Sequence, residues 1–125
     1  MTLQHVSLEL RREAVPAELR FWALLGFTQV EPPGTLGEIA AWVQRDGTQI
    51  HLLFDDHPVV PPSGHTAVVA EDFDAAVARL RGAGFQVEDA RELWGAMRAF
   101  AVAPAGHRVE VMAAPPPSGS RRAGS

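Results

Sequence analysis

Four side chains that could bind a metal ion or move a proton occupy matching places in the two halves of the chain. They are His5, His51, His65 and Glu110. The first and third open the two halves, whereas the second and fourth each stand four residues after a glycine, Gly47 or Gly106. Imidazole nitrogens and carboxylate oxygens bind ions such as Zn, Fe, Ni, Co and Mn. The set therefore predicts a metal site with positions left for substrate or water.

The matching places reflect an internal repeat. Gly26-Phe27 matches Gly84-Phe85, and Ala41-Trp42-Val43 matches Ala99-Phe100-Ala101, at an offset of about 59 residues. A repeat of this length is one supersecondary unit that cannot bury its apolar face alone. We therefore expect an α+β fold in which two tandem βαβββ modules form a curved mixed sheet around a central site.

Apolar spacing and turn residues predict the elements of each module. In the first module we expect a strand at 3–10, a helix at 16–25, and strands at 38–44 and 48–54 joined by the Asp46-Gly47 turn. In the second we expect a strand at 65–70, a helix at 72–82, and strands at 86–89, 98–102 and 107–112. The proline-rich segment 55–64 predicts a linker, and the Pro/Gly/Ser-rich segment 113–125 predicts a disordered tail. Residues 1–112 are thus one expected domain, with modules at 1–54 and 65–112.

The second and fourth candidate donors each lie between apolar neighbours, as in Ile50-His51-Leu52 and Val109-Glu110-Val111. Because side chains alternate along a strand, each donor should project to the face opposite its neighbours. Two sheets related by a pseudo-twofold axis would bring the four donors together. Two histidines with Glu110 also match the facial triad of non-haem iron sites, with His51 as a fourth ligand or as a donor to a ligand.

Four segments, in this order and spacing, resemble the vicinal oxygen chelate superfamily, which includes glyoxalase I, extradiol dioxygenases, methylmalonyl-CoA epimerase and the bleomycin and fosfomycin resistance proteins. The segments are Leu3-Gln4-His5-Val6-Ser7-Leu8, Phe21-Trp22-Ala23-Leu24-Leu25-Gly26-Phe27, Gly64-His65-Thr66-Ala67-Val68 and Gly106-His107-Arg108-Val109-Glu110-Val111. The resemblance covers residues 3–112. In metal-dependent members the ligands come from the first and fourth strands of each module. By position this implies His5, His51, His65 and Glu110 as ligands of a divalent Zn, Ni, Co, Mn or Fe ion.

The resemblance implies two classes of function. One is a metal-dependent lyase, isomerase or dioxygenase that chelates two oxygens of a small substrate, with Glu110 as the catalytic residue. The other is an antibiotic-binding resistance protein of the bleomycin resistance type, which sequesters a flat molecule without chemistry. Glyoxalase I usually carries a carboxylate where this chain has His51. Fosfomycin transferases usually place a tyrosine at Phe100, and the absence of tyrosine from this chain argues against that activity.

Four further residues are expected to line a substrate pocket, because such sites are mostly apolar with a few placed polar groups. They are Trp42, Trp94, Arg98 and Phe100. Core packing is the alternative for the aromatic rings, and Arg98 could pair either with an anionic substrate or with a neighbouring acid. Phe21 and Trp22, on the first predicted helix, are expected in the core.

The composition and charge of the chain limit the classes of partner and site that can be expected. The net charge is −4 and the basic residues are scattered, which argues against nucleic acid. The chain has no cysteine, so disulfides and thiolate metal sites are excluded. No apolar run approaches the roughly 20 residues of a membrane span, and no signal peptide is evident, so we expect a cytoplasmic protein. A chain of 125 residues has a high ratio of surface to volume, so its stability should be modest and pairing with a second copy is favoured. We therefore expect a homodimer that acts on a small molecule.

Overall fold

The computed structural model describes residues 1–119 and 122, and it contains two modules with the same element order. The first module comprises β1 (His5–Leu10), α1 (Val15–Leu24), β2 (Thr28–Val30), β3 (Ala40–Arg45) and β4 (Thr48–Phe54), with short 3-10 turns at Arg12–Ala14 and Leu36–Glu38. The second comprises β5 (His65–Val69), α2 (Phe73–Gly82), β6 (Val87–Ala90), β7 (Arg98–Val102) and β8 (Arg108–Met112). The predicted α+β fold of tandem βαβββ modules is confirmed.

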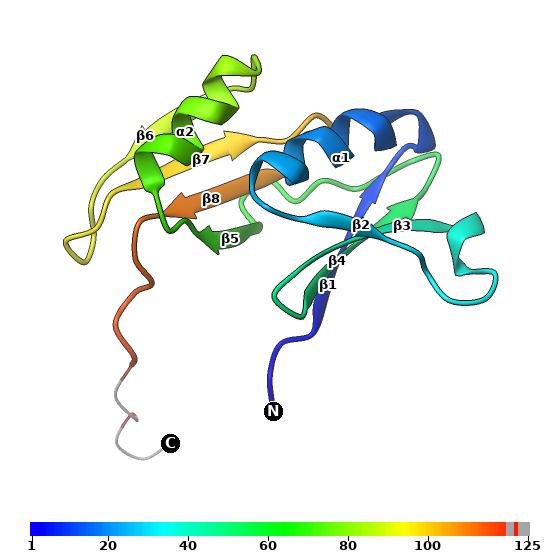
Figure 1. The fold of residues 1–125 in the computed structure, drawn as a ribbon, viewed down its shortest axis with the longest axis horizontal. Coiled ribbons are helices and arrows are strands. Elements are labelled where there is room, and N and C mark those ends of the chain that lie inside the picture. Colours follow the sequence, from blue (N-terminus) through cyan, green and yellow to red (C-terminus); the bar gives the residue numbers. More distant parts are fainter. Residues whose placement is uncertain (120–121, 123–125) are drawn as a thin grey trace.

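Each module forms one four-stranded mixed sheet. The first sheet has the order β1-β4-β3-β2 and the second has the order β5-β8-β7-β6. In each sheet the first strand is parallel to its neighbour and the other pairs are antiparallel. Both helices lie on the same side of the molecule, and the N-terminus leaves on the opposite side (Figure 1). We call the sheet face opposite the helices the open face of each sheet.

The strand register reproduces the repeat seen in the sequence. The His5–Gln49 pair of the first sheet corresponds to the His65–Arg108 pair of the second. Likewise the Trp42–His51 pair corresponds to the Phe100–Glu110 pair.

The structure contains the predicted hairpin turn, and it also contains one strand that the sequence did not predict. Asp46 and Gly47 have φ values of 49° and 81°, as the predicted tight hairpin turn requires. The sequence did not locate β2, because its three residues, which are mostly exposed, show no apolar alternation.

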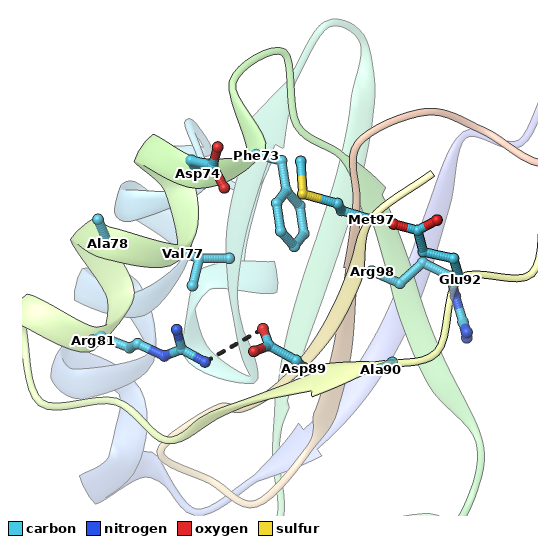
Figure 2. A pocket seen from close by; sticks show the side chains of 10 residues that line it. All are labelled: Phe73, Asp74, Val77, Ala78, Arg81, Asp89, Ala90, Glu92, Met97 and Arg98. Carbon is cyan, nitrogen blue, oxygen red and sulfur yellow. Dashed lines mark hydrogen bonds and ion pairs between the residues drawn. The ribbon is translucent and has the colours of Figure 1, made fainter. Parts of the chain in front are cut away.

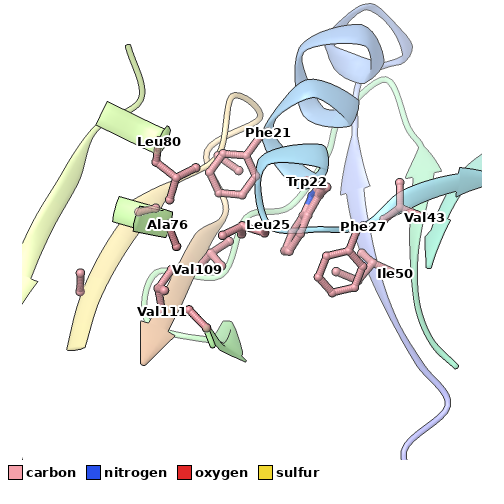
Figure 3. Close-up of a cluster of buried hydrophobic side chains, with 14 of the residues drawn as sticks. Phe21, Trp22, Leu25, Phe27, Val43, Ile50, Ala76, Leu80, Val109 and Val111 are labelled. Carbon is pink, nitrogen blue, oxygen red and sulfur yellow. The ribbon is translucent and has the colours of Figure 1, made fainter. Parts of the chain in front are cut away.

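The core is shared between the modules because α1 packs between them (Figure 3). Phe21 and Trp22 are fully buried, which confirms their predicted place in the core. The Phe21 ring meets Phe85 of the second module edge-on at 5.3 Å between centroids. The Trp22 ring meets Phe27 of the first module at 5.3 Å. Adjacent residues of one helix therefore fill both halves of the core.

Buried polar contacts also join the modules. The Glu18 carboxylate of α1 has no exposed surface, and it accepts hydrogen bonds from the Trp22 indole nitrogen at 3.0 Å and from the Ala105 backbone nitrogen at 2.7 Å. His107, which is also buried, donates from Nε2 to the Glu9 carbonyl at 2.7 Å. Burial raises the pKa of Glu18, although the two hydrogen bonds and the charge of His107 act in the other direction.

The segment after β8 begins in contact with the second module. The Ala113 nitrogen donates to the Met97 carbonyl at 2.9 Å, and the Trp94 indole donates to the Ala114 carbonyl at 2.9 Å. The predicted disordered tail spans 113–125, of which residues 120–121 and 123–125 lie outside the described residues. No helix in the described part of the chain is long and apolar enough to cross a membrane.

The raised pKa of Glu18 predicts a pH dependence of stability. Because the folded protein favours the protonated carboxyl, the free energy of unfolding should fall as pH rises above about 4.5 and through the raised pKa. Glu18→Gln should lack this component, so the stability difference between variant and wild type should grow in favour of the variant with increasing pH. Urea denaturation from pH 4 to pH 8 measures it. The exposed Glu13→Gln variant is the control, and parallel curves for wild type and Glu18→Gln would contradict the prediction.

Candidate metal and substrate site

Three stacked rings occupy the open face of the first sheet. The Trp42 indole lies on the His51 imidazole at 3.8 Å between centroids and 2° between planes. His51 in turn stacks on His5 at 4.0 Å and 15°. We call Trp42, His51 and His5 the ring stack. The ring stack forms because its three side chains lie on the same side of adjacent strands. Trp42 lies directly opposite His51 on the neighbouring strand. On β1, Ser7 is the register partner of His51, and His5 lies two residues before Ser7 and so on the same face.

The surroundings of His51 favour its uncharged form. Its side chain is almost fully buried, and its Nε2 lies 2.9 Å from the carboxamide oxygen of Gln49, to which it donates. Burial lowers the pKa of His51, and the positive charge that His5 can carry lowers it further. The neutral imidazole is the form that binds a metal ion, and Nδ1 remains available as an acceptor.

A charged cluster occupies the equivalent place on the second sheet. The Glu110 side chain is 7% exposed, and one of its oxygens lies 3.0 Å from His65 Nε2. Its other oxygen accepts a 2.7 Å hydrogen bond from Arg98 Nε, and Arg98 also donates to the Arg91 carbonyl at 2.7 Å. We call Glu110, His65 and Arg98 the carboxylate cluster. The sequence left open whether Arg98 pairs with an anionic substrate or with a neighbouring acid, and in the structure it pairs with the acid Glu110.

One chain holds the four candidate donors as two pairs. Among residues 1–119 and 122, no three histidine, aspartate or glutamate side chains converge as a metal site requires. The stacked rings of His5 and His51 cannot both bind one ion in this geometry, because an ion bound to histidine lies in the ring plane and these planes are nearly parallel. The donor types fit a divalent ion, but neither place in the single chain supplies a full set of ligands.

The predicted pocket residues are distributed over both open faces. Trp42 belongs to the ring stack, and Phe100 meets His65 edge-on at 5.1 Å. Trp94 lies under the Arg98 guanidinium at 5.3 Å. A cavity of about 560 Å³ lies elsewhere, between α2 and β6. It is lined by Phe73, Val77, Met97 and the Arg81–Asp89 ion pair, and of the predicted set only Arg98 reaches it (Figure 2).

Sequence reasoning missed two polar residues of these faces, Gln49 and Arg108. Each lies directly opposite the first histidine of its module, and each precedes the fourth-strand donor by two residues. Because residues two apart in a strand share a face, this spacing was the available signal.

The chain therefore belongs to the class of proteins built from two tandem βαβββ modules, with candidate metal-binding side chains on the open faces of both sheets. The sequence model of the Glyoxalase/Bleomycin resistance protein/Dioxygenase superfamily matches residues 2–111, so the chain belongs to this superfamily. The resemblance seen in the four sequence segments is thereby confirmed. No curated protein matches the chain in sequence.

Solved structures show the same fold at low sequence identity. A glyoxalase family protein from Bacillus anthracis superposes with a TM-score of 0.80 at 19% identity, covering 90% of this chain and 93% of the other. Oxidase ChaP-H2 gives 0.76 at 20% identity, covering 96% and 98%. TnmS3, an antibiotic-binding protein from Streptomyces sp. CB03234, gives 0.68 at 23% identity, covering 89% and 93%. These likenesses show a shared architecture.

The carboxylate cluster predicts a measurable energetic coupling. Arg98→Met leaves a nearly buried carboxylate with only His65 beside it, and should lower the free energy of unfolding by about 3 kcal/mol. Adding Glu110→Gln removes the charge and should recover part of this loss. Urea denaturation of the wild type, both single variants and the double variant gives the coupling energy. Strictly additive effects would show that the two side chains do not interact.

Proposed function

We propose that the chain is a divalent-metal-dependent enzyme of the glyoxalase type, whose site is completed by two copies of the chain. The observation that carries this proposal is the division of the four donors into equivalent pairs on the two open faces. A tight metal site in proteins uses three or four donors, and neither open face brings three together in the described residues. Two copies arranged so that the first sheet of one meets the second sheet of the other would combine one imidazole of the ring stack with the imidazole and the carboxylate of the carboxylate cluster, which makes three donors.

The open faces of the sheets support this pairing. The open face of β5 exposes Ala67 and Val69, and Val69 is 43% exposed. In a twofold dimer, each first sheet would face the second sheet of the other copy, so two identical sites would form.

The chemistry follows from the side chains present. A bound divalent ion would polarise oxygens of a small substrate that offers two of them, which suits lyase, isomerase or dioxygenase chemistry. Glu110 is the one carboxylate among the candidate donors, so it is the group that can accept a substrate proton. Arg98 fixes its orientation through the 2.7 Å hydrogen bond. Trp42 and Phe100 supply apolar walls that exclude water.

The ring stack favours a second candidate function. Its three nearly parallel rings form a flat surface on which a planar molecule could stack, as sequestration of an antibiotic would need. The similarity in fold to an antibiotic-binding protein is compatible with this alternative. Such a protein needs neither a metal ion nor an ionised Glu110.

Mixing two inactivated chains tests the shared site. One chain carries His5→Ala and His51→Ala, and the other carries His65→Ala and Glu110→Gln. In the mixed dimer, the intact second module of the former meets the intact first module of the latter, so about one metal ion per mixed dimer should bind. Each double variant alone should bind none. Elemental analysis of differently tagged, co-purified chains measures the recovery. Absence of metal from the mixed dimer, together with full occupancy in a monomeric wild type, would place the whole site in one chain.

A single variant separates catalysis from sequestration. Glu110→Gln should lower the metal content and weaken benzohydroxamate binding by at least about 100-fold, because hydroxamates bind through the ion. The exposed Glu13→Gln is the matched control. Calorimetry with benzohydroxamate and with a flat aromatic antibiotic gives both affinities. Metal-free wild type that binds the antibiotic tightly, with no loss in Glu110→Gln, would favour the sequestration function instead.

A further inference from the structure

One cation on the open face of the second sheet has no acidic partner among the described residues. The Arg108 guanidinium lies 4.3 Å from the centroid of the Phe100 ring. Within residues 1–119 and 122, no carboxylate lies within ion-pair distance of it. Arg98, on the same face, is already bound to Glu110 at 2.7 Å. The positive charge of Arg108 is therefore available to a ligand.

The repeat shows that this charge is specific to one module. The register position of Arg108 opposite His65 corresponds to that of Gln49 opposite His5. Gln49 is neutral and is engaged by His51 at 2.9 Å. The two open faces therefore offer similar donors but differ in charge, and the surplus cation lies beside the carboxylate cluster.

A cavity next to Arg108 has a lining suited to an organic anion. It has a volume of about 200 Å³ and lies where the edges of β1 and β5 approach each other. Its lining includes the apolar Val6, Leu8 and Pro61 and the polar His65, His107 and Arg108. His65 already contacts Glu110 and His107 already donates to the Glu9 carbonyl, so Arg108 is the group that remains for an anion. No aspartate or glutamate of the described residues lines it. A small molecule with an apolar body and a negative group would find both kinds of surface there.

We propose that Arg108 is a specificity-determining residue that binds a carboxylate of the substrate, so that the substrate class is small organic acids with an apolar or aromatic body. This proposal rests on the proposed function, because it assigns the substrate of that same site. The planar guanidinium can donate two parallel hydrogen bonds to a carboxylate, and its contact with the face of the Phe100 ring restrains its position. Phe100 thus positions the cation beside the group that accepts the proton.

Benzoate and its neutral analogue benzamide test the proposal on protein stripped of metal, by calorimetry. Wild type should bind benzoate more tightly than benzamide. Arg108→Met should weaken benzoate binding at least about tenfold without changing benzamide binding, and Arg108→Lys should lose less. Arg20→Met removes an exposed arginine of α1 and serves as the matched control.

The outcomes separate this proposal from the function on which it rests. Equal affinities of wild type for the two probes, no detectable benzoate binding, or unchanged benzoate binding in Arg108→Met would overturn the role of Arg108. The metal content of protein purified without chelator tests the proposed function independently. Arg108→Met should keep the metal content of wild type, because Arg108 is not among the donors.

Discussion

The helix α1 packs between the two modules, and this contact organises both halves of the core and the orientation of both sheets. Phe21 and Trp22 are adjacent, fully buried, and turned toward different halves of the core (Figure 3). Because the helices occupy the inner side of both sheets, the strands turn their other faces outward. The polar residues that alternate with the core residues are therefore collected on the open faces. The same packing holds the donors of the two modules as separate pairs.

Burial dictates how each pair is stabilised. A carboxylate that is 7% exposed needs compensation, which Glu110 receives from Arg98 on one oxygen and His65 on the other. His51 is buried without an acidic partner, so its uncharged form is favoured, and the Trp42 ring covers it. His51 and Glu110, which occupy equivalent positions of the repeat, are therefore stabilised in different ways. One face presents the ring stack, and the other presents a compensated charge beside an uncompensated cation.

Membership of the superfamily fixes the architecture and leaves the activity to the side chains of the open faces. The similar structures include an oxidase and an antibiotic-binding protein, at identities of 20% and 23%. What distinguishes the proposed activities in this chain is the chemical state of a few groups. A retained pair of imidazoles with an oriented carboxylate suits metal chemistry, whereas the flat ring stack alone would serve sequestration.

The two modules and the equivalence of the candidate donors could be predicted from the sequence, since both follow from local rules. A glycine turn sets the hairpin register and the period of two sets the face, so local spacing alone is enough to match His51 with Glu110. The predicted helices also begin and end within about two residues of the observed ones. Only the tertiary structure showed that Glu18 receives the Ala105 amide and that Arg98, rather than Arg108, neutralises Glu110. These contacts join residues far apart in the chain, or choose between two arginines on one face. They are decided by how the modules pack, which no local pattern encodes.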